Sequence, residues 1–310
     1  MIRKRILALG AGQGWHANSL REASTSLGCD FEVSDYASLT ASFLRGERDI
    51  HSDAGALSDF DVILTRTMPA SSFERITVRL AMLHEIHDQN SVGSFSEGED
   101  RRLPRVVNPP RSLELAIDKY ATLSRVAGLG YSVPETVVTQ TREEAFDAFK
   151  MLGGDCVIKP VFGGEGRGIM RVTDTELAWY VLSTLDRVDS VFYVQQFKPP
   201  GGIDYRLLVI GDEVFGIRRA NPDDFRANVA SGGECTWLKV AEDHRSMALK
   251  ISRELGLRYG AVDFLELEGG VPCVIEVNAI PGWKGAQKVA PFSIASRIIS
   301  SLLSSIDARE

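Results

Sequence analysis

The stretch Val157–Val172, VIKPVFGGEGRGIMRV, is the part of the chain around which the rest is interpreted. An apolar run that carries Lys159 leads into a glycine-rich segment, and the apolar pattern resumes at Ile169, so we predict strand, loop, strand. Glycines let backbone N–H groups approach an anion closely, and Lys159 adds a positive charge. A mobile hairpin with a solvent-facing lysine is the competing interpretation. The glycines are Gly163, Gly164, Gly166 and Gly168.

Two better-known phosphate-binding patterns do not fit. No Gly-Lys-Ser/Thr follows the loop, as a P-loop requires, and the loop returns to a strand instead of starting a helix. Near the N-terminus, Gly10-x-Gly12-x-Gly14 follows an apolar strand, but Trp15 stands where the third dinucleotide-fingerprint glycine belongs. A dinucleotide oxidoreductase is therefore the weakest of the hypotheses.

The composition indicates a globular protein of about two domains. Its 310 residues are 44% hydrophobic, enough for a normal core, and the net charge of −7 argues against general nucleic-acid binding. No apolar run approaches the length of a membrane helix, so we expect no membrane association. We expect a cytoplasmic protein with reduced core thiols, because its cysteines are far apart and form no CxxC pair. These are Cys29, Cys156, Cys235 and Cys273.

The first hundred residues predict a small parallel sheet, because strand-like and helix-like segments alternate. Arg66 follows the buried strand 61–65, at the strand end where open α/β sheets bind ligands, so it is either an acceptor contact or a surface arginine. His84 and His87 are either a metal pair or part of a solvated helix face. The expected elements here are strands 6–9, 31–36 and 61–65 and helices 19–27 and 73–86.

The polar stretch Asp88–Pro104 predicts a mobile linker or loop between the first domain and the rest of the chain. We place the domains at 1–108, 109–195 and 196–310, the first being the parallel domain. Asp118 is expected to cap a helix that holds Lys119 in its first turn, and Thr173–Glu176 to form a capping box. The further elements expected are strands 191–197, 205–210, 214–219, 261–267 and 271–277, and helices 177–185, 241–255 and 294–306.

The last hairpin carries the strongest chemical signal. If Gly269-Gly270 is a two-residue turn, Asp263 lies directly opposite Glu276, where like charges repel. Asn278 points to the same face, so three oxygen donors converge, and a magnesium ion would relieve the repulsion. In the competing interpretation, one carboxylate is exposed and the other pairs with an arginine.

Basic residues gather in the preceding segment of this acidic chain and suggest an anion pocket, since arginine grips phosphate or carboxylate with two hydrogen bonds. Asn228 shares a face with Arg226 if that segment is extended. The arginines are Arg206, Arg218, Arg219 and Arg226.

Taken together, these motifs resemble the ATP-grasp superfamily, and most closely the RimK-type amino-acid (α-L-glutamate) ligases. The resemblance runs from about Asn108 to the C-terminus, and the first hundred residues match only a generic pre-ATP-grasp domain. It implies an α/β (α+β) ATP-grasp fold, with a small parallel domain before two lobes. The motifs are Asp118-Lys119, Val157-Ile158-Lys159-Pro160 with its glycine loop, Asp204-Tyr205-Arg206, Asp224-Phe225-Arg226-Ala227-Asn228, Ser231-Gly232-Gly233, Val262-Asp263-Phe264, Glu276-Val277-Asn278-Ala279 and Pro281-Gly282.

The resemblance implies an ADP-forming carboxylate–amine ligase that uses ATP and two Mg²⁺ ions, or Mn²⁺. It implies that Lys119, Lys159 and the glycine loop bind phosphates, with adenine near Gln196 and Phe197. It further implies nucleotide contacts from Asp204, Arg226 and Asn228, and metal binding by Asp263, Glu276 and Asn278. Arg218, Arg219 and Arg226 would stabilise an acylphosphate. Asp263→Asn and Lys159→Ala should each abolish turnover and leave unfolding nearly unchanged.

Two departures from the family pattern concern the substrates. Gln196 replaces a hinge glutamate, which preserves a partner for adenine. Trp283-Lys284-Gly285 stands where ribosomal-protein ligases resemble Leu-Glu-Gly, so the acceptor is in doubt. A lysine and an aromatic ring would suit an acidic, ring-bearing acceptor such as a folate-like coenzyme, tetrahydromethanopterin. The expected partners are ATP, a glutamate-like amino acid and a small-molecule or peptide acceptor, in a homo-oligomer. The alternative is a non-catalytic ATP-binding regulator.

Overall fold

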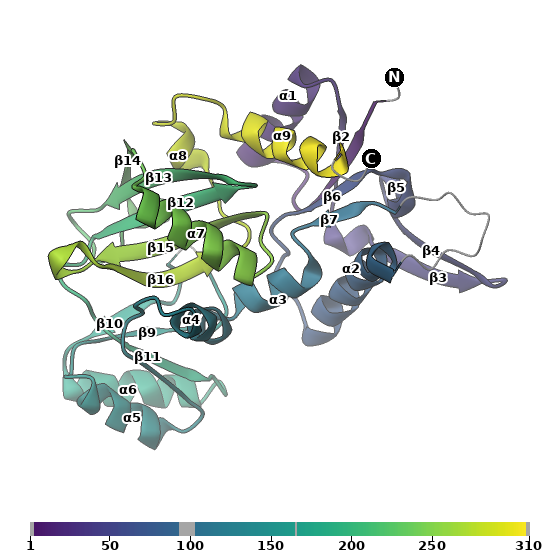
Figure 1. The fold of residues 1–310 in the computed structure, drawn as a ribbon. Coiled ribbons are helices and arrows are strands. Elements are labelled where there is room, and N and C mark those ends of the chain that lie inside the picture. The colour runs from purple at the N-terminus through teal and green to yellow at the C-terminus, as the bar shows by residue number, and fades with distance from the viewer. Residues whose placement is uncertain (1–2, 93–102, 165, 308–310) are drawn as a thin grey trace.

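The computed structural model describes residues 3–92, 103–164 and 166–307 (Figure 1). Most of the predicted linker therefore lies outside the described residues, as does Glu165 of the glycine loop. The part of that linker before residue 93 belongs to α2 (Phe73–Val92), which is longer than its apolar pattern predicts.

The first sheet is parallel and has the order β2-β1-β6-β7, which confirms the prediction for this part of the chain. Its two inner strands, β1 and β6, are almost entirely buried, so they read as continuous apolar runs, whereas the edge strand β2 is largely exposed or half-buried. Helix α1 (Trp15–Ser26) begins four residues before the predicted start, directly after the loop Gly10–Gly14. The strands are β1 (Arg5–Leu9), β2 (Asp30–Ser34), β6 (Val62–Thr65) and β7 (Arg105–Val107).

A small antiparallel sheet between β2 and β6 was not predicted. It consists of β3 (Thr40–Leu44), β4 (Glu47–Ser52) and β5 (Gly55–Ala56), and it projects from the body of the molecule (Figure 1). Of the residues in β3 and β4, only Ile50 and Ser52 are buried. Its strands therefore lack the hydrophobic alternation from which a half-buried strand is recognised.

The central lobe is an antiparallel sheet of order β10-β9-β11-β8, with α5 (Arg142–Met151) and α6 (Thr175–Asp186) packed on one face. The glycine stretch is a strand, a loop and a strand, as predicted, because β9 pairs antiparallel with β10. The predicted capping box is wrong: Asp174 is the N-cap of α6 and accepts from the Leu177 N–H. The strands are β8 (Thr136–Thr139), β9 (Cys156–Lys159), β10 (Met170–Val172) and β11 (Phe192–Gln196).

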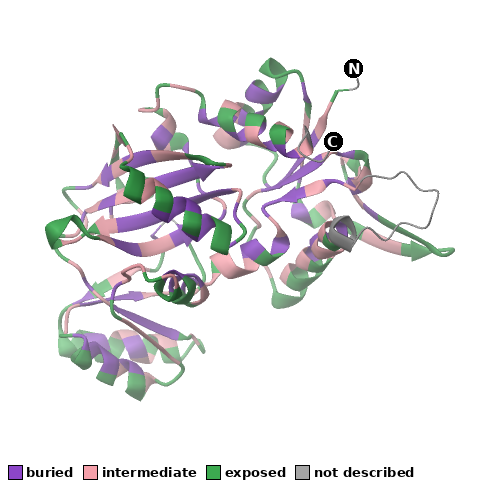
Figure 2. Ribbon diagram, in the orientation of Figure 1, coloured by how far each residue is buried: buried purple, intermediate pink, exposed green. Residues whose placement is uncertain are grey.

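The third sheet is antiparallel, with the order β14-β13-β12-β15-β16. Helices α7 (Glu242–Glu254), α3 (Pro110–Ile117) and α4 (Lys119–Gly128) bury one face. The other face packs with α9 (Ile294–Asp307), α8 (Lys284–Gln287) and the first sheet in one continuous core (Figure 2). The strands are β12 (Ile203–Ile210), β13 (Glu213–Ala220), β14 (Glu234–Leu238), β15 (Tyr259–Glu266) and β16 (Pro272–Asn278).

The last hairpin has the predicted pairing for a different reason. Asp263 does lie opposite Glu276, but the assumed two-residue turn is wrong. The Leu267 N–H bonds to the Val271 carbonyl at 2.9 Å across a three-residue loop, and a β-bulge follows Asp263. The extra loop residue and the bulge cancel, so the register at the carboxylates is unchanged.

Asn108 joins the first sheet to the third. Its side-chain amide donates to the carbonyls of Tyr259 and Ala279 at 2.6 and 2.7 Å, and its oxygen accepts from the N–H groups of Arg258 and Tyr259. All its hydrogen-bonding capacity is used in a buried position. The proposed domain boundary at residue 108 thus lies at a rigid connection, and the three-domain division stays a prediction.

The four cysteines are free thiols, and all but Cys235 are buried. Within the described residues, no helix combines the length and the apolar character needed to cross a membrane.

Candidate active site

Lys159 ends β9 and points to the same face of the central sheet as Tyr193 and Gln195 of β11. Its Nζ donates to Gln195 Oε1 at 2.6 Å, and Gln195 Nε2 donates to the Thr136 hydroxyl at 3.0 Å. Burial lowers the pKa of Lys159 to about 8, although the charge of Glu276 opposes that change. Sequence reasoning missed Gln195, which the two-residue periodicity of β11 places beside Lys159.

Lys119 lies in the first turn of α4, where Asp118 caps the helix as predicted. Its Nζ donates to the Gly163 carbonyl at 2.7 Å and lies 3.8 Å from Glu276 Oε1. The residue is 7% exposed. A lysine at a helix N-terminus is unfavourable by itself, and the carboxylate and loop carbonyl compensate for its charge here.

The glycine loop contacts both the helix that carries Lys119 and the segment between β13 and β14. The Gly166 carbonyl accepts from Arg226 Nη1 at 3.3 Å. A Cβ added to Gly166, whose φ is +75°, would lie 3.1 Å from Asn228 Oδ1. Gly166 is therefore required both by its backbone conformation and by this close approach. The loop thus bridges the two lobes, which brings Gly163 and Gly166 together with the predicted Arg226 and Asn228. Gly164 and Gly168 belong to the same loop.

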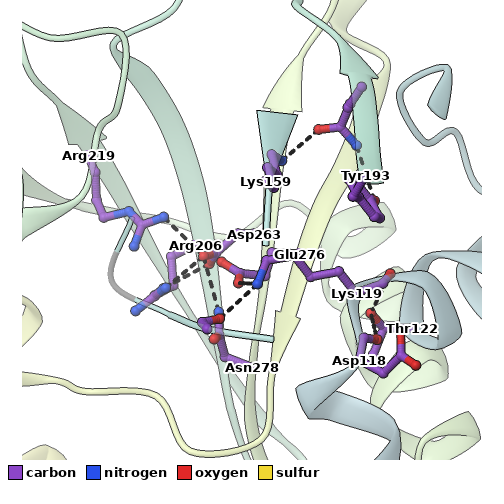
Figure 3. Close-up of polar contacts among 12 residues, drawn as sticks. Asp118, Lys119, Thr122, Lys159, Tyr193, Arg206, Arg219, Asp263, Glu276 and Asn278 are labelled. Atoms are coloured by element: carbon purple, nitrogen blue, oxygen red, sulfur yellow. Dashed lines mark hydrogen bonds and ion pairs between the residues drawn. The ribbon is translucent and has the colours of Figure 1, made fainter. Parts of the chain in front are cut away.

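Asp263 is fully buried in an ion-pair network (Figure 3). It lies opposite Arg206 on β12, which donates to its two oxygens at 2.8 and 2.6 Å, and Arg219 Nη2 adds a contact of 3.0 Å. Burial alone would raise the pKa of Asp263, but the two arginines hold it below its usual value.

The predicted metal ligands lie together but are already compensated by basic groups. Asn278 Nδ2 lies 3.5 Å from Asp263 Oδ2, and Glu276 lies across the hairpin with 24% of its side chain exposed. The competing interpretation is right for Asp263, which pairs with arginines, and wrong for Glu276, which is half-buried and lies 3.8 Å from Lys119 Nζ instead of being exposed. Among the described residues, no group of three or more His, Cys, Asp or Glu side chains has metal-binding geometry. The donor chemistry nonetheless fits magnesium, because two carboxylates and an amide oxygen share one patch.

Asp204 and Arg219 form a second buried pair, with two hydrogen bonds of 2.6 Å. Both carboxylate oxygens of Asp204 already accept hydrogen bonds from Arg219, and its contact with the nucleotide stays a prediction. Arg219 joins Asp204 to Asp263, so it positions these carboxylates. Arg218, its neighbour on β13, points to the opposite face beside Tyr205, which removes it from the predicted catalytic set.

The two residues predicted to contact adenine, Gln196 and Phe197, follow each other at the end of β11. Gln196 points to the opposite face of β11 from Lys159, where it donates to the Leu152 carbonyl at 3.5 Å and accepts from Lys198. Phe197 is 8% exposed, with the Arg171 guanidinium 3.5 Å from its ring centroid. Gln196 is thus separated from the phosphate lysines by the sheet itself.

The residues predicted to face the acceptor are close together. The Arg66 guanidinium lies 4.8 Å from the centroid of the Trp283 ring, and Trp283 is only 1% exposed. Arg66 lies over this buried ring, so its face is not free to stack on a substrate ring, which removes the argument for a ring-bearing acceptor. Elsewhere, His84 Nε2 pairs with Glu114 at 2.8 Å, so the solvated-face interpretation needs this correction: the histidine has a partner.

Comparison with known proteins identifies one family and several similar ligases. The RimK-like ATP-grasp domain family matches residues 116–302. A probable alpha-L-glutamate ligase 2 of Shewanella denitrificans is 30% identical over 93% of this chain and 91% of its own length. The ribosomal protein bS6–L-glutamate ligase of Escherichia fergusonii shows the same identity and the same two coverages.

Solved structures resemble the whole chain. The ATP-grasp ligase PsnB, complexed with a phosphomimetic variant of its minimal precursor, Mg and ADP, has a TM-score of 0.71 at 20% identity, covering 98% of this chain and 99% of PsnB. A RimK domain ATP-grasp protein of Sphaerobacter thermophilus has a TM-score of 0.68 at 22% identity, covering 96% and 99%. These likenesses establish the ATP-grasp fold.

Proposed function

This chain belongs to the RimK-like ATP-grasp family of ADP-forming ligases, and from that premise we propose that it joins L-glutamate to an acidic acceptor through an acylphosphate. The observation that carries the proposal is the meeting of Lys119, Lys159, Glu276 and the glycine loop between the central and third sheets. No observation favours the non-catalytic regulator.

The two lysines are the proposed phosphate contacts. Lys119 is buried and Lys159 is half-buried, and the charge of Lys119 acts on Lys159, so they lie close enough to bind one polyphosphate. Two cations held close together away from water are unfavourable without an anion, and the Glu276 carboxylate, which acts on both, offsets them only in part. An ATP triphosphate would complete the compensation, and the glycine loop would cover it.

Magnesium would be held by Glu276, Asn278 and Asp263, with phosphate oxygens as the remaining ligands. Bound there, it would neutralise charge on the phosphates during transfer. Arg206 and Arg219 compensate Asp263 in the present structure, so loading the ion requires Asp263 to share its oxygens with them. The proposal of two ions rests on the family resemblance alone.

The chemistry needs no protein nucleophile. A carboxylate oxygen of the acceptor attacks the γ-phosphorus of ATP, the bond to the β-phosphate oxygen breaks, and ADP leaves. The glutamate amine then attacks the acyl carbon, phosphate leaves, and the amine loses a proton as the amide forms. Catalysis is therefore chiefly orientation and charge stabilisation.

Arg206 and Arg226 are the arginines proposed to stabilise the transferred phosphoryl group. Arg226 reaches the loop carbonyl of Gly166 and pairs with Asp224 at 2.6 Å, so loop closure and substrate charge act on the same side chain. Arg206 has 15% of its side chain exposed, whereas Arg219 is buried by its two carboxylates. Arg219 is thus assigned a positioning role.

The choice of glutamate and of a peptide-like acid as acceptor follows the names of the relatives, one of which acts on ribosomal protein bS6. A folate-like acceptor keeps only the support of Lys284, since the Trp283 ring is buried. The homo-oligomer and the cytoplasmic location stay predictions.

The test is phosphate release from ATP with a panel of amino acids and acceptor acids, with each substrate omitted in turn and products identified by mass spectrometry. The proposal predicts ADP and phosphate only when acid and amine are both present, with a product heavier by one glutamate residue. Absence of turnover with every pair, in protein that binds ADP–Mg, would refute it.

A further inference from the structure

Arg66 is held firmly at the carboxyl end of β6. Its N–H donates to the Leu9 carbonyl at 2.8 Å, and its own carbonyl accepts from the buried Tyr36 hydroxyl at 3.1 Å. A Cβ added to Gly10 would lie 2.8 Å from the Arg66 Cβ. A side chain at position 10, in the loop after β1, would therefore collide with Arg66, which explains the glycine there.

The side chain of Arg66 ends among aromatic rings with one nitrogen unpaired. Its guanidinium lies 4.8 Å from the Trp283 ring centroid and 5.6 Å from that of Tyr259. Six buried side-chain nitrogen or oxygen atoms in the described residues have no hydrogen-bond partner, and Arg66 Nη1 and Trp283 Nε1 are two of them. Buried donors are normally satisfied, so two in contacting side chains point to an absent acceptor.

The N-terminus of α1 adds further positive potential at the same place. Its first residues, Trp15 and His16, contact Trp283, with ring centroids 6.2 and 4.4 Å away. The helix has no side-chain cap and no acidic residue in its first turn, and nothing lies within 4 Å of a Cβ built on its N-cap, Gly14. Such a terminus attracts an anion.

His16 is not a source of positive charge at this site. Burial, followed by the charges of Arg66 and Lys284, lowers its pKa to about 4, so the ring is neutral near pH 7. In that form its Nε2 accepts a hydrogen bond of 3.1 Å from the backbone N–H of Trp283. The charged groups that lower the pKa of His16 are both basic, so Lys284 adds its positive charge to that of Arg66 near this ring.

This site lies along the same strand as the reaction centre. Tyr259 and Asp263 are both on β15 and face the same side of the sheet. Four residues of strand separate them by roughly 13 Å. A single extended substrate of about four peptide units can therefore reach from Arg66 to the proposed site of phosphoryl transfer.

We propose that Arg66, Trp283 and the first turn of α1 bind a second carboxylate of the acceptor, roughly 13 Å from the carboxyl group that is activated. The acceptor is then an acidic, peptide-like chain whose distal carboxylate binds at this site, beside the first sheet. This inference rests on the proposed function, because Asp263 marks the reacting end only if ATP–Mg binds there.

The test is calorimetric titration of the full chain, in ADP and Mg²⁺, with tetra-L-glutamate as the probe. Tetra-L-glutamine is the uncharged probe of equal length, and inorganic phosphate tests for a simple anion site. The variants are Arg66→Gln and Trp283→Phe, which keeps a ring but removes the N–H donor. Arg75→Gln, at an exposed position of α2, is the control with the same charge change.

We expect tetra-L-glutamate to bind the wild type and Arg75→Gln equally, and Arg66→Gln about ten- to a hundredfold more weakly. Trp283→Phe should weaken the same probe, while ADP binds all variants alike. Equal binding of tetra-L-glutamine, equal binding by Arg66→Gln and Arg75→Gln, no binding of tetra-L-glutamate, or Arg66-dependent binding of phosphate alone overturns the inference. Loss of ADP binding in the wild type would instead refute the proposed function.

Discussion

The replacement Asp263→Asn tests whether buried charge pairing, as well as catalysis, depends on this carboxylate. Asp263 is 1% exposed and accepts three hydrogen bonds of 2.6 to 3.0 Å from Arg206 and Arg219. Removing its charge leaves two partly or fully buried guanidinium groups with a single remaining carboxylate, Asp204. Breaking a buried pair in this way costs about 3–5 kcal/mol, and the asparagine oxygen that remains as an acceptor favours the lower end.

The chain offers a matched control in Asp155→Asn. Asp155 pairs with Arg171 through two hydrogen bonds of 2.9 and 2.7 Å, the same geometry, but 40% of its side chain is exposed. An exposed pair contributes at most about 1 kcal/mol, so the two replacements differ chiefly in burial.

The assay is urea unfolding followed by tryptophan fluorescence, with the free energy of unfolding compared at equal slope. Asp263→Asn should lose at least about 2 kcal/mol more than Asp155→Asn, and only Asp263→Asn should abolish amide formation. This reverses the prediction from the sequence, in which Asp263→Asn leaves unfolding nearly unchanged. Equal losses for the two variants would refute the ion-pair network around Asp263.

Three further predictions follow from single contacts. Lys159 is charged below its pKa of about 8, so calorimetry should show that the affinity for ATP–Mg falls as the pH rises through 8. Lys159→Arg, which stays charged, should flatten that fall. An unchanged pH profile in Lys159→Arg would contradict the assignment of Lys159 as a phosphate contact. Gly166→Ala should lower kcat by about tenfold or more while ADP affinity changes little, because the added Cβ is 3.1 Å from Asn228 Oδ1 and φ is +75°; normal kcat argues against loop closure over the phosphates. Asn108→Ala should cost about 2–4 kcal/mol in urea unfolding, since buried backbone groups, including those of Tyr259, lose their partners; a loss below about 1 kcal/mol contradicts that role.

The elements predicted correctly are those whose own residues show a strong period. Strand 61–65 and the helix that begins at Phe73 are examples, because the spacing of their apolar residues shows which faces are buried. The β3–β4 hairpin has one buried apolar residue, Ile50, so no local pattern marks it. The facing of Asp263 and Glu276 was right only because a longer loop and a bulge compensate each other.

The site divides in the same way. Lys119, Lys159 and Glu276 were recognisable, because their motifs are local and the structure brings them together. Gln195 and the pairing of Arg206 with Asp263 depend on which strands become neighbours, which is a tertiary property. The separation of neighbouring strand residues onto opposite faces was available from the two-residue period. That rule alone distinguishes Arg219 from Arg218, and Gln195 from Gln196.

The central claim, that an acceptor carboxylate is activated by phosphoryl transfer between the two lobes, is tested most directly by isotope transfer. The acceptor found in the phosphate-release screen is labelled with oxygen-18 in its carboxyl groups and incubated with the protein, ATP, Mg²⁺ and L-glutamate. An acylphosphate requires that the released phosphate carry one labelled oxygen for each amide formed, with ADP as the other product. Unlabelled phosphate, or AMP with pyrophosphate, would contradict it.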